Sequence, residues 1–273
     1  MSIVGDTVIC PFQINCGACD FCKRGLTGSC ESVKAGSSYG LGPLGGITWG
    51  GTLSDYALVP YADAMLVKVD AGSERLASLA DNVPDGRRTV AAHLAARPGA
   101  PVLILGGAGP SSIPLYAAAI AIALGSSQVD YVDFDAKRLE IAKSIGANPV
   151  EIKQGEYPKR FGKWPITVDS CNNVDGLHCA IRSTEPGGVC TSTSIYFGAG
   201  VPMPLLEMYT RGVTFVTGRV HARAAIEPIL ALVQAGKFAP EQVTSETADW
   251  DDAIDALCSY TTKLIITRAP LAL

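Results

Sequence analysis

Residues 102–112 read Val-Leu-Ile-Leu-Gly-Gly-Ala-Gly-Pro-Ser-Ser, an apolar run that ends in glycines. Four consecutive apolar residues are typical of a strand that is buried on both faces of a sheet. The glycines allow a tight turn, and the alanine-rich stretch 113–124 that follows predicts a helix. Strand, turn and helix together form the first half of a crossover between parallel strands.

The same alternation continues along the chain. Further strands and helices are expected in turn at 129–132, 137–145, 166–168, 176–183, 189–192, 204–210, 214–217 and 224–234. This order predicts an α/β fold, a doubly wound parallel sheet covered by helices on both faces. Before residue 81, short runs at 6–10, 54–60 and 65–69 predict small antiparallel strands. We therefore expect three parts: a β-rich part at 1–83, the parallel α/β domain at 84–222, and a C-terminal segment at 223–273.

The glycine turn has the features of a dinucleotide-binding loop. Gly107 allows the tight turn, and Gly109 lets the backbone approach a pyrophosphate. The free N–H groups at the start of the helix attract the same negative charge. Ser112 replaces the third glycine of this pattern, so the fingerprint is weakened but not lost. The predicted cofactor-binding residues of the turn are Gly106, Gly107, Ala108, Gly109, Pro110 and Ser111.

Asp133 ends the next predicted strand, where this fold places the carboxylate that binds the adenosine ribose. Such a carboxylate repels a 2′-phosphate, and no arginine follows Asp133 directly, so NAD is favoured over NADP. The alternative is an exposed aspartate that caps the helix starting near Ala136, a role that Asp135 also suits.

Four cysteines lie within 15 residues: Cys16, Cys19, Cys22 and Cys30. Four thiolates can close a tetrahedral shell around one zinc ion, which leaves no position open for substrate. The sequence therefore predicts a structural zinc lobe. Disulfides or buried free thiols are the alternative, but nine cysteines are an odd number and Met1 to Gly5 do not form a secretion signal. We expect reduced thiols and a cytoplasmic protein.

Composition excludes two classes of partner. The net charge is −4 and no cluster of basic residues occurs, so nucleic-acid binding is not expected. The longest apolar stretch, 113–124, is too short to cross a bilayer.

Taken together, these motifs resemble the zinc-containing medium-chain alcohol dehydrogenases. The resemblance rests on Gly5-Asp6-Thr7-Val8, the four-cysteine lobe, Gly50-Gly51 with Asp55-Tyr56, Asp81, and the glycine turn, and it extends to the strand 262–267. It implies a GroES-like catalytic domain, of which 1–83 is a part, around a Rossmann domain. It also implies interconversion of a small alcohol and a carbonyl compound with NAD, and a homodimer or homotetramer.

In that family a second, catalytic zinc binds the substrate oxygen, and Asp81 matches one of its ligands. The other ligands, a cysteine and a His-Glu pair, precede the four-cysteine lobe, and no His-Glu dipeptide occurs in this sequence. We therefore expect an N-terminally truncated chain without a catalytic zinc and with little or no turnover. Without the resemblance, Asp81 is expected to act as an N-cap for the segment from Asn82, a role that Asp85 also suits.

Three hypotheses follow for the function. The first is an NAD-dependent alcohol dehydrogenase with incomplete catalytic zinc ligands. The second is an NAD(H)-binding protein without activity, and the third is a zinc-dependent interaction module. Two further residue predictions remain open. His221 either faces the nicotinamide or lies at the surface or at a helix cap, and the stretch 195–197 is a candidate strand at a subunit interface.

Overall fold

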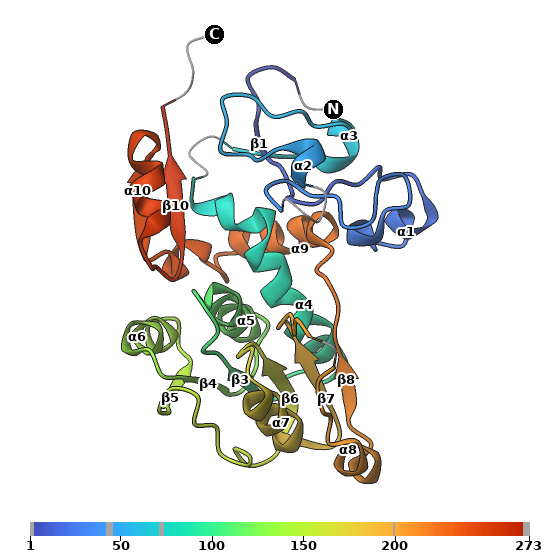
Figure 1. The fold of residues 1–273 in the computed structure, drawn as a ribbon, viewed down its shortest axis with the longest axis vertical. Coiled ribbons are helices and arrows are strands. Elements are labelled where there is room, and N and C mark those ends of the chain that lie inside the picture. The colour runs from blue at the N-terminus through green and yellow to red at the C-terminus, as the bar shows by residue number, and fades with distance from the viewer. Residues whose placement is uncertain (1–2, 42–45, 71–73, 199, 270–273) are drawn as a thin grey trace.

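The computed structural model describes residues 3–41, 46–70, 74–198 and 200–269. Its largest element is a six-stranded parallel sheet in the order β5-β4-β3-β6-β7-β8 (Figure 1). The order reverses beside β3, and such a switch point is where open α/β sheets bind their ligands. The predicted doubly wound α/β fold is therefore confirmed. The strands are β3 (Val102–Leu105), β4 (Val129–Asp133), β5 (Asn148–Glu151), β6 (Trp164–Asp169), β7 (Thr184–Ser192) and β8 (Thr214–Val216).

Helices cover both faces of this sheet. Along β3, Val102 and Ile104 enter the hydrophobic core under one face, and Leu103 and Leu105 enter the core under the other. All four side chains are buried, which explains the unbroken apolar run in the sequence. The first face carries α4 (Asn82–Ala96), α5 (Ser112–Ala123) and α6 (Ala136–Ser144), and the second carries α7 (Val174–Ser183) and α8 (Leu205–Arg211).

The N- and C-terminal parts lie beyond one end of α4 (Figure 1). In the first part, β1 (Thr7–Ile9) pairs antiparallel with β2 (Val67–Val69). In the second, β9 (Glu246–Asp249) pairs parallel with β10 (Leu264–Thr267). The other elements are α1 (Asp20–Lys23), α2 (Gly46–Trp49), α3 (Ala62–Met65), α9 (Ala222–Gln234), α10 (Ala253–Cys258) and the 3-10 helices Thr27–Ser29, Glu74–Ala80, Pro240–Val243 and Trp250–Asp252.

Several element predictions were wrong or missing. Residues 54–60 form no strand, and the side chains of Tyr56 and Leu58 are exposed there. No other segment among the described residues pairs with this stretch as a strand requires. The stretch 195–197 is not a strand either, and the sheet edge beyond it is β8. β5 and the long helix α4 were not predicted. The domain boundaries stay a prediction: residue 83 lies in α4, and residue 222 is the first of α9.

None of the helices in the described ranges is long and apolar enough to cross a membrane. All nine cysteines are free.

Candidate cofactor pocket and metal centre

The four predicted zinc ligands come together in space. The Sγ atoms of Cys16, Cys19, Cys22 and Cys30 all lie within 4.8 Å of one another. The short helix α1 carries Cys22, and a 3-10 turn brings Cys30 back to the group. Sulfurs bound to one zinc at about 2.3 Å lie about 4 Å apart, so these side chains fit a tetrahedral ion.

Backbone N–H groups point at the sulfurs of this lobe. The Cys16 sulfur accepts from the N–H groups of Ala18 and Cys19, both at 3.3 Å, and from the Ser32 hydroxyl at 3.2 Å. The Cys30 sulfur accepts from the Cys16 N–H at 3.4 Å. Such donors stabilise thiolates, the form in which cysteine binds zinc. In this site zinc would cross-link the chain and have a structural role, since cysteines would fill all four of its coordination positions.

The cysteine lobe docks onto the start of α9. The Gly28 N–H donates to His221 Nδ1 at 3.0 Å, and the Ala222 N–H donates to Gln13 Oε1 at 3.1 Å. A side chain at Gly28 would clash, since its Cβ would lie 2.6 Å from the Val220 carbonyl. His221 therefore joins the lobe to the C-terminal segment. It occupies the N-cap position of α9, as one of its two predicted roles allows, but its side chain makes no cap hydrogen bond.

This histidine predicts a pH effect on stability. Burial, with the charge of Arg88 nearby, lowers the pKa of His221, and burial likewise lowers the pKa of His93. Near pH 6 the unfolded chain therefore binds more protons than the folded chain. The free energy of unfolding is undiminished above pH 6.5 and falls as the pH drops below that value. We expect His221→Gln, whose amide oxygen can still accept from the Gly28 N–H, to lose less free energy of unfolding than the wild type between pH 7.5 and 5.5.

Urea unfolding at both pH values measures this difference. His178→Gln is the control, since His178 is distant in sequence from the cysteine lobe and its ring forms a hydrogen bond with the Pro202 carbonyl. Equal pH dependence in wild type and His221→Gln would contradict the role of the neutral imidazole.

The glycine turn is held by its own serine. The Ser111 hydroxyl donates to the Ala108 carbonyl at 2.6 Å and accepts from the Gly107 N–H at 3.3 Å. Ser111 itself has a left-handed φ of 57°. At Gly109, where φ is 49°, nothing lies within 4 Å of the position a Cβ would take. The turn thus presents an open backbone surface at the beginning of α5, where a phosphate group fits.

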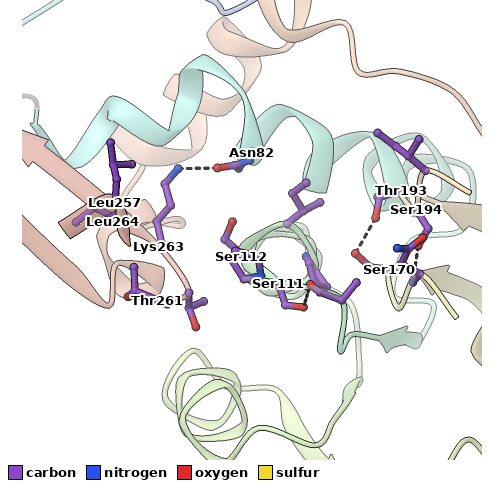
Figure 2. A pocket seen from close by; sticks show the side chains of 18 of the residues that line it. Asn82, Ser111, Ser112, Ser170, Thr193, Ser194, Leu257, Thr261, Lys263 and Leu264 are labelled. Carbon is purple, nitrogen blue, oxygen red and sulfur yellow. Dashed lines mark hydrogen bonds between the residues drawn. The ribbon is translucent and has the colours of Figure 1, made fainter. Parts of the chain in front are cut away.

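A cavity of about 580 Å³ opens in front of this turn. Its walls come from the start of α4, the glycine turn and α5, the carboxyl ends of β6 and β7, and the segment between α10 and β10 (Figure 2). Among the lining residues that the structure describes, Lys263 carries the only charged side chain. Its ammonium group donates to Asn82 Oδ1 at 2.6 Å, and burial lowers its pKa. Lys263 was not predicted as a site residue, although it lies within the predicted strand 262–267; in the structure it directly precedes β10.

On the opposite wall, polar side chains follow β6 and β7. Ser170 and Thr193 share a hydrogen bond of 2.7 Å, and the Ser194 hydroxyl accepts from the Asn172 N–H at 2.9 Å (Figure 2). Ile195 and Phe197 also line the cavity, which gives this stretch a place in the pocket. The cavity therefore combines one cation, several hydroxyls and apolar surface, as a nucleotide-binding site requires.

Asp133, the predicted ribose ligand, is not among the residues that line this cavity. Its side chain is buried and forms an ion pair with Arg138, at 2.7 Å between Oδ1 and Nη2. The alternative of an exposed capping aspartate is wrong, because Asp135 caps α6 by accepting from the Arg138 N–H at 3.0 Å.

Asp81 precedes α4 but makes no cap hydrogen bond with its side chain. Burial raises the pKa of its carboxyl to about 6, and the negative charge of Asp85 adds to this, against Lys263 and Arg219. Among the described residues, the four cysteines are the only group of three or more His, Cys, Asp or Glu side chains that could hold a metal ion. The role of Asp81 as a ligand of a catalytic zinc stays a prediction.

Comparisons with known proteins match both the N-terminal part of the chain and its whole fold. Residues 2–71 match the model of the alcohol dehydrogenase GroES-like domain. A glutathione-independent formaldehyde dehydrogenase of Pseudomonas aeruginosa (strain LESB58) is 40% identical over 152 residues, which are 52% of this chain and 37% of that protein. One from Bacillus subtilis (strain 168) is 35% identical over 218 residues, 72% of this chain and 52% of that protein. The chain thus spans about half or less of the length of these relatives.

Among solved structures, the alcohol dehydrogenase TADH from Thermus sp. ATN1 is similar to this chain, with a TM-score of 0.81 and 26% identity. The match covers 97% of this chain and 80% of that one. The similarity therefore includes the cysteine lobe and the parallel sheet together.

Proposed function

We propose that this chain, a member of the zinc-containing medium-chain alcohol dehydrogenase family, binds NAD(H) in the pocket in front of the glycine turn and α5. With this cofactor it interconverts a small alcohol and an aldehyde or ketone. The observation that carries this proposal is the open backbone at Gly109, which faces a cavity containing the ammonium group of Lys263.

The residues of the pocket fit the cofactor's charged centre. A pyrophosphate at the glycine turn would meet the N-terminal end of α5 on one side and the Lys263 ammonium on the other. The hydroxyls of Ser170, Thr193 and Ser194 would hold the remaining polar groups. In this pocket NAD would supply a hydride acceptor: the hydride of the alcohol carbon would leave as part of NADH, the hydroxyl proton would leave to water, and a carbonyl compound would result.

Zinc is proposed for the four-cysteine lobe, where it stabilises structure. The buried positions of Cys22 and Cys30 and the contact of the lobe with α9 support this role. A catalytic metal is not assigned to Asp81.

Two measurements test the function in sequence. Titration with NADH, followed by its fluorescence, should saturate below about 1 mM, in the range of ordinary substrate affinities. Oxidation of methanol, ethanol and benzyl alcohol with NAD should then be assayed, with formation of NADH as the readout. Failure to bind NADH contradicts the whole proposal.

A second function is an NAD(H)-binding protein that turns over no alcohol. It is favoured by one observation, that Asp81 belongs to no metal-binding group among the described residues. Saturable NADH binding with turnover well below about 1 per second would select it, and turnover of that order would exclude it.

Lys263 provides a specific prediction for either function. Lys263→Gln removes the cation of the pocket but keeps a donor for Asn82. Because charge-assisted hydrogen bonds contribute about 1.5–3 kcal/mol, we expect NADH binding to weaken by about tenfold or more. Lys137→Gln, at an exposed position of α6, makes the same change of net charge and should leave binding unaltered. Equal NADH affinities of Lys263→Gln and Lys137→Gln would show that the phosphates of the coenzyme bind away from Lys263.

We further propose that the chain forms a homodimer or homotetramer. β8 ends the sheet, and Leu205, Leu206 and Tyr209 of the neighbouring α8 are exposed. Sedimentation velocity should give twice or four times the mass of 28.4 kDa, and a monomer at micromolar concentration would contradict this expectation.

A further inference from the structure

A second cavity, of about 480 Å³, lies at the edge of the parallel sheet opposite the cofactor pocket. Its lining residues come from the loop before β6, the end of α7 and the helix α8: Lys159, Arg160, Arg182, Glu207, Thr210 and Arg211. These segments precede the strands β6, β7 and β8, whereas polar residues of the cofactor pocket follow β6 and β7 (Figure 1). The two cavities share no lining residue and are separate sites.

The charge of this second cavity is opposite to that of the whole chain. Its four cationic side chains outnumber its one carboxylate, that of Glu207, while the chain carries a net charge of −4. Among the described residues, no carboxylate forms an ion pair with Lys159, Arg160 or Arg211. Cations that are gathered in this way repel one another, and an anion bound between them removes the repulsion.

Arg182 offers donors that suit such an anion. Its Nε donates to both oxygens of the Glu207 carboxylate, at 2.9 and 3.2 Å, which fixes the guanidinium group. Among the described residues, its two terminal nitrogens, Nη1 and Nη2, have no hydrogen-bond acceptor. The side chain is 26% exposed, so these nitrogens are still accessible to a ligand. A planar pair of N–H donors matches two oxygens of a phosphate group.

Arg211 makes the same cavity tolerant of negative charge. The helix α7 ends here, and the free carbonyl groups at the end of a helix repel anions. The Arg211 guanidinium covers these carbonyls. It donates to the carbonyl oxygens of Ile181 at 3.2 Å, Arg182 at 3.1 Å and Thr184 at 2.7 Å. Because a fixed cation neutralises the end of α7, the helix does not oppose an anion beside Arg182.

We propose that this second cavity is a binding site for a phosphate group. The terminal nitrogens of Arg182, the Arg160 guanidinium and the Lys159 ammonium group bind the phosphate oxygens. The volume admits inorganic phosphate as well as a phosphate ester of a small molecule. This site does not depend on the proposed function, because none of its residues lines the cofactor pocket.

The test is isothermal titration calorimetry of the full chain with inorganic phosphate and with glycerol 3-phosphate. We expect saturable binding with a Kd of about 1 mM or below. The double variant Lys159→Gln/Arg160→Gln should weaken this binding at least about tenfold, because it removes two charge-assisted contacts. Both side chains are exposed, so the fold does not depend on them. Lys137→Gln/Lys143→Gln, at exposed positions of α6, makes the same change of net charge and should leave the Kd unaltered.

Lys263→Gln separates the two cavities. It removes the cation of the cofactor pocket and should leave phosphate binding intact, whereas Lys159→Gln/Arg160→Gln should bind NADH as the wild type does. Phosphate binding that is lost in Lys263→Gln and kept in the double variant would place the phosphate in the cofactor pocket and overturn the inference. No saturation below about 10 mM with either compound would overturn it as well.

The two compounds identify the source of the phosphate group. A lower Kd for glycerol 3-phosphate would identify a phosphate ester as the preferred ligand, and equal Kd values would show that the phosphate group alone is recognised. Both results support the site.

Glu207→Gln provides a test of opposite sign. Its amide oxygen can still accept from Arg182 Nε, while the carboxylate of the cavity is lost. We expect phosphate binding to tighten about twofold to fivefold, because the repulsion between the carboxylate and the ligand is removed. Weaker phosphate binding in Glu207→Gln would contradict the position of the phosphate group beside Arg182.

Discussion

Cys30→Ser should remove zinc from the purified chain and lower its thermal midpoint by about 10 °C. Cys30 is buried within the four-cysteine group, and its sulfur accepts the Cys16 N–H. Without a fourth thiolate the site loses most of its affinity, and the binding free energy of a structural zinc is also folding free energy. A loss of about 3–4 kcal/mol corresponds to this shift in a chain of 273 residues, at 2–4 °C per kcal/mol.

Elemental analysis of protein purified without added metal should give about one zinc per wild-type chain and close to none for Cys30→Ser. Cys258→Ser is the matched control, since Cys258 is exposed and lies outside the group. Full zinc content in Cys30→Ser, or no zinc in the wild type, would contradict the structural zinc site.

The four cysteines could be predicted from the sequence because their geometry is local. Fifteen residues with two short turns leave few ways to arrange four thiols, and all of them bring the sulfurs close together. The parallel sheet was predictable for a similar reason, since runs such as Val102–Leu105 are buried on both faces and carry no polar residue.

Residues that depend on contacts between distant segments were missed. Lys263 reaches Asn82 across 181 positions, and nothing in the sequence around it indicates a pocket. Arg138 lies five positions after Asp133, and the pairing depends on the first turn of α6, which returns the guanidinium to the carboxylate.

α4 was missed for a related reason. Its first five residues contain Pro84 and Gly86, which both have low helix propensity, so the local pattern argues against a helix. Tertiary packing outweighs this propensity: Val83, Val90 and Leu94 are buried in the core beside α5. Residues 54–60 show the opposite case, since the apolar run 56–59 forms no strand there without a pairing partner among the described residues.

The glycine in α4 that weakens the sequence signal is required by the fold, which leads to a second large effect. A Cβ at Gly86 would lie 2.8 Å from the Ala117 nitrogen and 2.9 Å from the Ile113 carbonyl oxygen. Both atoms belong to the backbone of α5, so no side-chain rotation relieves the clash. Gly86→Ala should therefore destabilise the protein by about 3 kcal/mol from overpacking, although alanine favours a helix by about 1 kcal/mol.

The same substitution should weaken NADH binding, because Ile113 lies in the first turn of α5, directly after the glycine turn that faces the cavity. If α4 pushes α5 outward, the open backbone at Gly109 moves with it. Urea unfolding measures the first effect and NADH titration the second. Gly51→Ala is the control, since nothing lies within 4 Å of its Cβ position and its φ is not positive. A Gly86→Ala chain as stable as Gly51→Ala would show that the two helices can separate at little cost, and the close α4–α5 contact would then not be what positions the pocket.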